Sequence, residues 1–227
     1  MAGRNKTSVD RATAAYIAPF LVFVGFLGIK TVFHPAAHLY YPGQFLAVLL
    51  TIGLVSRGVL PFRVAFSLAS VGIGIAVFLL WIGPDALWGY RHHWLFDNSI
   101  TGTPASSISP ALKQNVIFLV LRVATSVALV PVLEELFWRG WLMRWLIDKD
   151  FLNVPLGTYA RGAFWIVAVL FASEHGPYWE VGLVAGIVYN WWIIHTRNLA
   201  DCMLAHAVTN GLLAAYVLMN GQWQYWL

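Results

Sequence analysis

Long apolar stretches separated by short polar or basic connections organise this sequence of 227 residues. About twenty consecutive apolar residues form an α-helix long enough to cross the hydrocarbon core of a bilayer. We therefore expect about seven membrane-spanning helices, at approximately 14–33, 44–60, 64–82, 112–130, 160–173, 181–195 and 199–219. The pattern predicts an all-α, polytopic transmembrane helical bundle.

Prolines and polar residues indicate where these helices end. The helical pattern over residues 112–147 is about 54 Å long at 1.5 Å per residue, too long for one straight span. Pro131 is the expected break, followed by an amphipathic segment over about 133–147. Two further breaks are expected at Pro35 and Pro42, between the first two spans.

The connections are unequal in length. Residues 83–110 form the longest polar stretch, which we expect to be an external loop anchored at the interface by Trp88 and Trp94. Residues 1–13 are predicted to be a cytoplasmic tail. Residues 14–227 are predicted to form a single transmembrane domain.

Basic residues predict the orientation, because cytoplasmic connections carry an excess of Lys and Arg. Only Arg91 and Lys113 clearly fall on the other side when the N-terminus is cytoplasmic. The cytoplasmic set is then Arg4, Lys6, Arg11, Arg57, Arg63, Arg144, Lys149, Arg161 and Arg197. We expect an integral membrane protein with its N-terminus inside.

Composition supports this class of protein. The chain is 59% hydrophobic and only 11% charged, which is typical of membrane spans and not of a soluble core. Its net charge of +4 lies in the connections, so no nucleic-acid partner is predicted. Cys202 is the only cysteine, which excludes an internal disulfide and a zinc site built from cysteines.

Two adjacent glutamates and an arginine interrupt the apolar sequence near Pro131. A charge in hydrocarbon costs roughly 2.5–3.5 kcal/mol on insertion scales, so Glu134, Glu135 and Arg139 are candidates for a functional site. Glu135 and Arg139 have the i, i+4 spacing of an ion pair. Glu134 points about 100° away on the helix and is free to face a cavity.

Polar residues recur in the later helices. His175 follows the fifth span, and His206 and Asn210 share one face of the seventh. A carboxylate that takes a proton from water, two imidazoles that hold the water and an amide that stabilises an oxyanion form a hydrolytic set. The alternative is structural: intramembrane His residues and i, i+4 Glu/Arg pairs also serve packing alone.

Three short motifs, Glu134-Glu135-x-x-x-Arg139, Phe171-x-x-x-His175 and His206-x-x-x-Asn210, resemble those of the CPBP family of CAAX-protease and bacteriocin-processing membrane proteins. Their order, identities and spacing agree over about residues 111–219, so the resemblance implies that the catalytic helices of the domain lie there. The sequence around them also resembles the subgroup associated with bacterial exosortase systems, which implies a location in the bacterial plasma membrane.

This resemblance implies an intramembrane endopeptidase that hydrolyses a membrane-anchored protein or peptide. Carried over to this sequence, Glu134 is the general base, His175 and His206 position the water or a metal, and Asn210 supports the oxyanion. Glu135 and Arg139 receive supporting roles. The cofactor stays open, because His175, His206 and Glu134 also suit one zinc ion with an open position.

Two other classes of function remain: a catalytically silent scaffold or immunity-type protein, and a proton-coupled transporter using Glu134 as a relay. A conflict of depth also remains, because Glu134 and His206 are predicted toward the cytoplasm and His175 toward the opposite face. Either the fifth span is short or displaced, or the segment after Pro131 re-enters the membrane. Arg122 and Asn190 are expected to make structural contacts between helices.

Overall fold

The computed structural model describes residues 6–61 and 67–226, apart from the side chains of residues 6–8. Arg4, Arg63 and the first three residues of the predicted third span lie outside the described part. Within that part the chain is helical and forms no β-strand, which confirms the predicted all-α class.

The main helices follow one another with short connections. They are α1 (Lys6–Phe33), α2 (Ala37–Leu54), α3 (Leu68–Trp88), α4 (Pro110–Lys113), α5 (Val116–Ala124), α6 (Val130–Glu135), α7 (Met143–Trp145), α8 (Arg161–Ser173), α9 (Trp179–Thr196) and α10 (Leu199–Asn220). Two π-helical segments, η2 (Thr125–Leu129) and η3 (Leu136–Leu142), join α5, α6 and α7 into one continuous helix. Short 3₁₀ turns lie at Tyr90–His92, Phe151–Asn153, Gly176–Tyr178 and Trp223–Tyr225.

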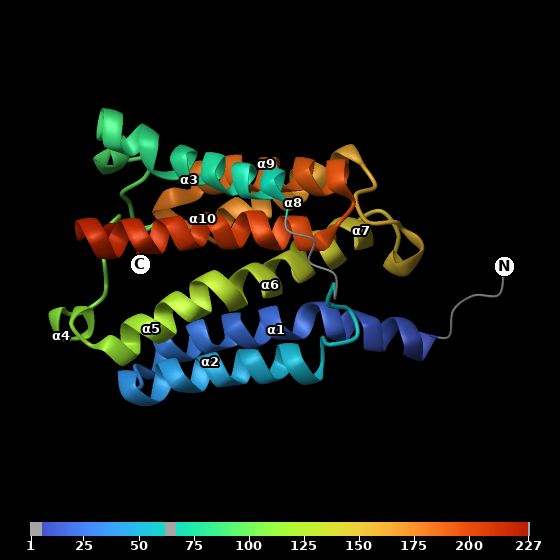
Figure 1. Ribbon diagram of the computed structural model, residues 1–227, viewed down its shortest axis with the longest axis horizontal. Coiled ribbons are helices and arrows are strands. Elements are labelled where there is room, and N and C mark those ends of the chain that lie inside the picture. The colour runs from blue at the N-terminus through green and yellow to red at the C-terminus, as the bar shows by residue number, and fades with distance from the viewer. Residues whose placement is uncertain (1–5, 62–66, 227) are drawn as a thin grey trace.

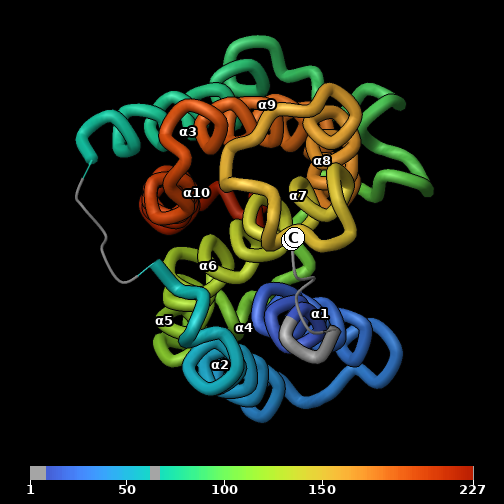
Figure 2. Tube along the Cα trace, turned by 90° about the vertical axis from the view of Figure 1, so that its right-hand side faces the viewer, coloured from blue at the N-terminus to red at the C-terminus, as the bar shows by residue number. Residues whose placement is uncertain are grey.

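The continuous helix Val116–Trp145, which we call the central helix, lies between two groups of helices (Figures 1 and 2). Viewed end-on, α1 and α2 gather on one side, and α3, α8, α9 and α10 on the other. The closest packing is between α3 and α10 and between α8 and α9, while α1 packs on α2. The central helix contributes α6 and η3 to contacts with both α1 and α10, so its middle lies inside the bundle.

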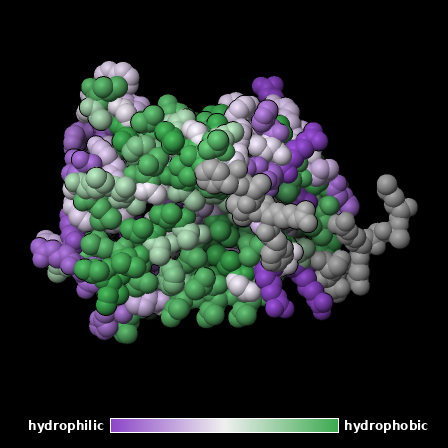
Figure 3. All heavy atoms as spheres, viewed as in Figure 1, coloured by the Kyte–Doolittle hydropathy of each residue, from purple (hydrophilic) through white to green (hydrophobic). Residues whose placement is uncertain are grey.

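Within the described residues, the helices that are long and apolar enough to cross a membrane are five: Val9–Phe33, Ala37–Leu54, Leu68–Trp88, Val116–Trp145 and Leu199–Asn220. Apolar side chains form a broad band over the visible face, with hydrophilic groups toward its two ends (Figure 3). The protein is an integral membrane protein. α8 is a shorter apolar helix, and α9 is not among the five. The number of spans and their orientation stay predictions.

The predicted break at Pro131 is wrong, because one helix runs from Val116 to Trp145. Proline lacks an N–H group, and its ring clashes with the carbonyl group four residues earlier. The π-helical turn η2 ends at Leu129, directly before the segment that contains Pro131. This wider turn accommodates the ring without ending the helix.

The predicted helix ends are also wrong at two other prolines. α2 begins at Ala37 and carries Pro42 inside it, so only residues 34–36 separate α1 from α2. α3 continues through Pro84 to Trp88, which shortens the expected loop. Each proline loses a single backbone hydrogen bond, and the neighbouring turns keep the helix intact.

Gly74 lets α3 approach α10 closely. A Cβ atom at this position would collide with the Ala205 carbonyl oxygen and the Val208 side chain. The Thr209 hydroxyl donates a hydrogen bond of 2.9 Å to the Gly74 carbonyl oxygen. Small residues of this kind permit such contacts between membrane helices, and the contact fixes the face of α10 that carries His206.

Candidate functional site

The two glutamates of the central helix lie in different surroundings. The Glu135 side chain is fully buried, and its Oε1 accepts a hydrogen bond of 3.0 Å from Arg139 Nη1. This is the ion pair that the i, i+4 spacing predicts. Glu134 is 9% exposed, and its Oε2 has no hydrogen-bond partner within the described residues. Glu134 therefore retains an acceptor for a water molecule.

Arg139 is 1% exposed, and its other N–H groups donate hydrogen bonds to residues of α9. Its Nε donates to Asn190 Oδ1 at 2.9 Å, and its Nη2 donates to the Gly186 carbonyl oxygen at 3.3 Å. Asn190 Nδ2 in turn donates to the Phe164 carbonyl oxygen on α8 at 2.8 Å. The predicted interhelical role of Asn190 is thus linked to the site, a connection that the sequence did not indicate.

His206 joins α10 to both glutamates. Its Nδ1 lies 3.0 Å from Glu135 Oε1, and its Nε2 lies 3.9 Å from Glu134 Oε2. An ionised carboxylate only accepts hydrogen bonds, so Nδ1 must be the donor. Nε2 of the neutral ring is then a hydrogen-bond acceptor on the side of Glu134.

Stacking and a hydroxyl chain fix the imidazole of His206. Its ring stacks on Tyr189, with centroids 5.2 Å apart and planes 23° from parallel. The Tyr189 hydroxyl donates to Thr209 Oγ1 at 2.7 Å, and Thr209 donates to the Gly74 carbonyl oxygen. α3, α9 and α10 therefore hold one side of the site together. Tyr189 and Thr209 carried no sequence signal for this role.

His175 lies just beyond the end of α8. Its Nδ1 is 2.7 Å from the Phe171 carbonyl oxygen, which makes Nδ1 the donor and Nε2 the acceptor. The ring packs against Phe171 at 4.8 Å and against Trp81 at 5.2 Å between centroids. α8 has only 13 residues, and His175 after its end lines the same cavity as Glu134 and His206.

Asn210 reaches from α10 back to the central helix. Its Nδ2 donates a hydrogen bond of 2.8 Å to the Ser126 carbonyl oxygen. That carbonyl group belongs to the π-helical segment η2, where backbone acceptors depart from the regular α-helical pattern. The second N–H of the Asn210 amide remains for another acceptor.

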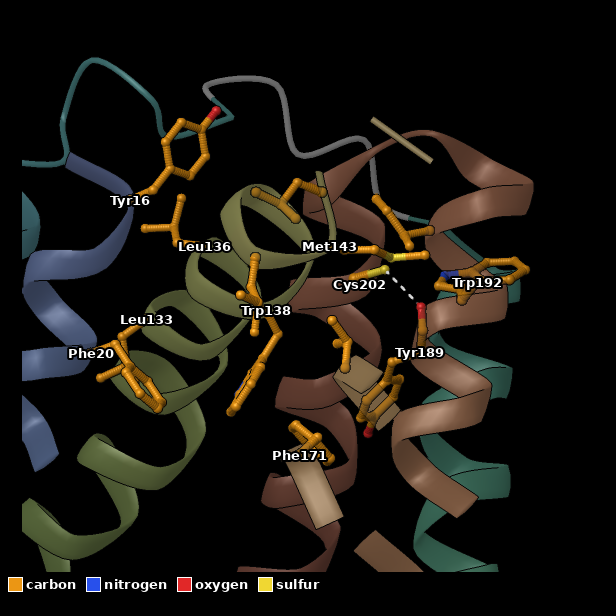
Figure 4. Packing of buried hydrophobic residues seen from close by; sticks show 14 of the residues in the cluster. Tyr16, Phe20, Leu133, Leu136, Trp138, Met143, Phe171, Tyr189, Trp192 and Cys202 are labelled. Carbon is orange, nitrogen blue, oxygen red and sulfur yellow. Dashed lines mark hydrogen bonds between the residues drawn. The ribbon is translucent and has the colours of Figure 1, made fainter. Parts of the chain in front are cut away.

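These side chains meet around one cavity of about 160 Å³. Glu134, His175, His206 and Asn210 all line it. Its walls are otherwise mostly apolar and aromatic, and Figure 4 shows Phe171 and Tyr189 on neighbouring helices beside Trp138 of the central helix. The structure thus brings all four predicted catalytic residues to one cavity, with Glu135 and Arg139 directly behind it. Their catalytic roles stay predictions.

A wider cavity of about 460 Å³ adjoins the first and shares Trp81, His175 and Tyr225 with it. Residues of the long loop, including Thr101 and Thr103, form its outer wall together with Glu174.

A buried cation holds the neighbouring loop in place. Arg91 is 3% exposed, and its guanidinium contacts Glu180 at 2.9 Å and Asp85 at 3.3 Å. It also donates to the Pro177 carbonyl oxygen and lies 4.2 Å from the centre of the Tyr178 ring. The expected external loop is therefore tied to α3 and α9.

A metal ion needs at least three donors close together in most protein sites. Within the described residues, no group of three His, Cys, Asp or Glu side chains is placed to hold a metal ion. The arrangement therefore does not fit a preformed zinc site, although both imidazoles direct an Nε2 acceptor away from their anchored Nδ1. The zinc ion stays a prediction, and no chemical step below depends on it.

The comparisons with known proteins agree with the three motifs. A family model described as type II CAAX prenyl endopeptidase Rce1-like matches residues 116–212. These residues carry the Rce1-like family pattern. The matched range contains Glu134, His175, His206 and Asn210, so it covers the whole candidate site. No curated protein and no solved structure matches the chain.

The Rce1-like match confirms the resemblance to the CPBP family of membrane proteases. It supports a protease embedded in the lipid bilayer as the class of this protein. The finer resemblance to an exosortase-associated subgroup is not addressed by this match and stays a prediction.

Proposed function

We propose that the protein is an intramembrane endopeptidase that hydrolyses a peptide bond with a water molecule activated by Glu134. The observation that carries the proposal is the convergence of Glu134, His175, His206 and Asn210 on one cavity, in a chain whose residues 116–212 match a protease family. Neither of the other classes, a silent scaffold or a proton-coupled transporter, accounts for an oxyanion donor and two oriented imidazoles at the same cavity.

The first step uses the unpartnered oxygen of Glu134. A water in the cavity donates one hydrogen bond to Glu134 Oε2 and the other to an imidazole Nε2, since both groups are acceptors. Glu134 takes a proton from this water as the oxygen attacks the carbonyl carbon of the peptide bond. General-base catalysis of this kind contributes about 10²–10⁴-fold to a rate.

The second step uses Asn210. As the new C–O bond forms, negative charge develops on the carbonyl oxygen, and the free N–H of the Asn210 amide is available to stabilise it. Glu134 then delivers its proton to the departing nitrogen, and the C–N bond breaks. The water proton that Glu134 accepted thus ends on the new amine, and the new carboxyl group carries the water oxygen.

Glu135 and Arg139 position these groups without contacting the peptide. Glu135 selects the tautomer of His206 through Nδ1, and Arg139 neutralises Glu135 and ties it to α9. Partners of this kind fix the orientation of a functional imidazole. Because the cavity lies within the bundle and opens toward the long loop, its substrate is a membrane-anchored protein or peptide. Identification of the cleaved protein will decide between two kinds of substrate. One is a prenylated protein, as the family description names, and the other is a protein with a sorting tail.

Mapping of new protein termini tests the proposal in cells. Membranes from cells that express the wild-type protein are compared with membranes from cells that express Glu134→Gln. The proposal predicts at least one membrane-anchored protein whose cleaved terminus appears only with the wild type. Identical termini in both, at equal expression of the two proteins, would favour the silent scaffold.

A further inference from the structure

A second polar cavity, of about 190 Å³, lies between α1, α2 and the central helix. Two cationic side chains line it, Lys30 from α1 and Arg122 from α5. Its other polar lining residues are Tyr40, Tyr41, Gln44, Thr125 and Ser126. None of the described residues that line it is acidic, so both charged residues of its lining are cationic.

Two buried groups point to a ligand in this cavity. Tyr40 and Gln44 are only 5% and 6% exposed. Within the described part of the chain, neither the Tyr40 hydroxyl nor Gln44 Nε2 has a hydrogen-bond partner. Leaving such a group unsatisfied costs about 1–3 kcal/mol. Two unused donors beside two cations form an environment for an oxygen-rich anion.

The cavity lies near one end of the bundle, at the depth that we expect for the membrane interface. Lys30 is one turn from the end of α1 at Phe33, and Tyr40 is in the first turn of α2. Arg122 is six residues into α5, about 9 Å from its start at 1.5 Å per residue. Figure 1 shows the connection between α1 and α2 and the start of α5 at the same end of the bundle. Lipid headgroups occupy this depth.

The cavity also reaches the surface of the bundle. A neighbouring cavity of about 520 Å³ shares Leu27, Lys30, Tyr40 and Tyr41 with it. Leu27 is 42% exposed on the outside of α1. An anion that enters here has apolar surface beside it for an attached hydrocarbon chain.

We propose that this cavity binds the phosphate of an anionic phospholipid. Lys30 and Arg122 balance its charge, and Tyr40 and Gln44 donate hydrogen bonds to its oxygens. The bound lipid would lie directly behind the catalytic cavity, because Val130 lines both. Ser126, whose carbonyl group holds Asn210, lines the lipid cavity as well. This site goes beyond the proposed peptidase activity and does not depend on it.

Binding of phosphatidylglycerol and phosphatidylcholine to the delipidated full-length protein in neutral detergent, measured by native mass spectrometry, tests the proposal. We expect tighter binding of phosphatidylglycerol, weakened about tenfold by Lys30→Gln, since a charge-assisted hydrogen bond is worth a decade or more of affinity. Gln44→Leu should weaken it in the same direction. Lys113→Gln is the matched control, because Lys113 lies at the same end but lines neither cavity.

Each of the following results would overturn the proposal. Equal affinity for the two lipids would remove the anion preference, and an unchanged affinity in Lys30→Gln would place the lipid elsewhere. Competition by inorganic phosphate as effective as phosphatidylglycerol would indicate a site for a free anion. If Lys30→Gln instead raises KM for a cleaved peptide while lipid binding is unchanged, the cavity serves the substrate. Lipid binding needs no cleavage, so this test is independent of the peptidase proposal.

Discussion

Glu135 Oε1 lies 3.0 Å from His206 Nδ1, which joins two motifs separated by 71 residues of sequence. The same oxygen accepts from Arg139, so one carboxylate serves a cation on its own helix and an imidazole on α10. Glu134, the adjacent residue, keeps its Oε2 without a hydrogen bond among the described residues. Because the two glutamates have different partners, substitution by glutamine should affect the stability of the protein differently at Glu135 and at Glu134.

Glu135→Gln should destabilise the protein strongly. It leaves the buried Arg139 guanidinium without its counter-charge, and breaking a buried ion pair costs about 3–5 kcal/mol. We expect a clear fall in the thermal unfolding temperature in detergent, with no such fall in Glu134→Gln. Equal unfolding temperatures for the two variants would contradict the distinct surroundings described above.

Asn190→Leu should lower stability as well, because it deprives Arg139 Nε and the Phe164 carbonyl oxygen of their partners. Each unsatisfied buried group costs about 1–3 kcal/mol. The control is Asn220→Leu, at the exposed end of α10, which should unfold like the wild type. Thermal unfolding of both variants checks this prediction, and a stability of Asn190→Leu equal to that of the control would refute it.

Gly182→Ala should slow catalysis without weakening the fold. A Cβ atom there would lie 3.1 Å from Cγ and Nδ1 of His175, so the imidazole must shift by a few tenths of an ångström. Since a displacement of 1 Å can cost about 10²-fold in rate, we expect a loss of about tenfold in kcat. Alanine also suits a helix interior better than glycine.

Gly162→Ala is the control for this substitution, because a Cβ atom on Gly162 meets nothing within 4 Å. Its kcat should equal that of the wild type. A fall in the unfolding temperature of Gly182→Ala that accounts for the lost activity would argue against local displacement of His175.

The loop beside the site should make the stability of the folded protein fall at alkaline pH. Burial, together with the hydrogen bond to Glu180, raises the pKa of Tyr90 to about 12 from an ordinary value of 10.0. The folded state therefore binds this proton more tightly than the unfolded state. The resulting stability is complete below about pH 10 and is lost as the pH rises toward about 12.

Tyr90→Phe should remove part of this pH dependence. We expect its unfolding temperature to fall less steeply between about pH 10 and 12 than that of the wild type. Tyr159→Phe, which changes an exposed tyrosine in a different loop, should keep the wild-type slope. Parallel curves of unfolding temperature against pH for all three proteins would show that ionisation of Tyr90 does not affect the stability of the fold.

The sequence predicted the helical class and the residues that gather at the site. The length of an apolar stretch, and a charged residue within it, can both be read from neighbouring residues in the sequence. The i, i+4 spacing was enough to pair Glu135 with Arg139. The effect of Pro131 was not predictable in this way, because the π-helical turn that accommodates it packs against α2 and α10, which are distant in the sequence. Proline alone favours a break.

Contacts between distant helices were also invisible in the sequence. Asn190 contacts Arg139 across 51 residues, and Thr209 contacts Gly74 across 135. Neither contact follows from periodicity, because periodicity gives the face of a helix but not its neighbour. The depth of His175 was uncertain for the same reason, since it depends on where the short helix α8 sits in the bundle.

The most direct test of the account is peptide-bond cleavage by the purified protein in lipid, on a membrane-anchored substrate found by terminus mapping. We predict that Glu134→Gln lowers the cleavage rate by about 10²–10⁴-fold at an unchanged unfolding temperature. Asp148→Asn, at an exposed position after α7, should cleave like the wild type, and a parallel assay with chelator asks whether a metal takes part. Cleavage by Glu134→Gln at the wild-type rate would contradict the role of Glu134 as the base.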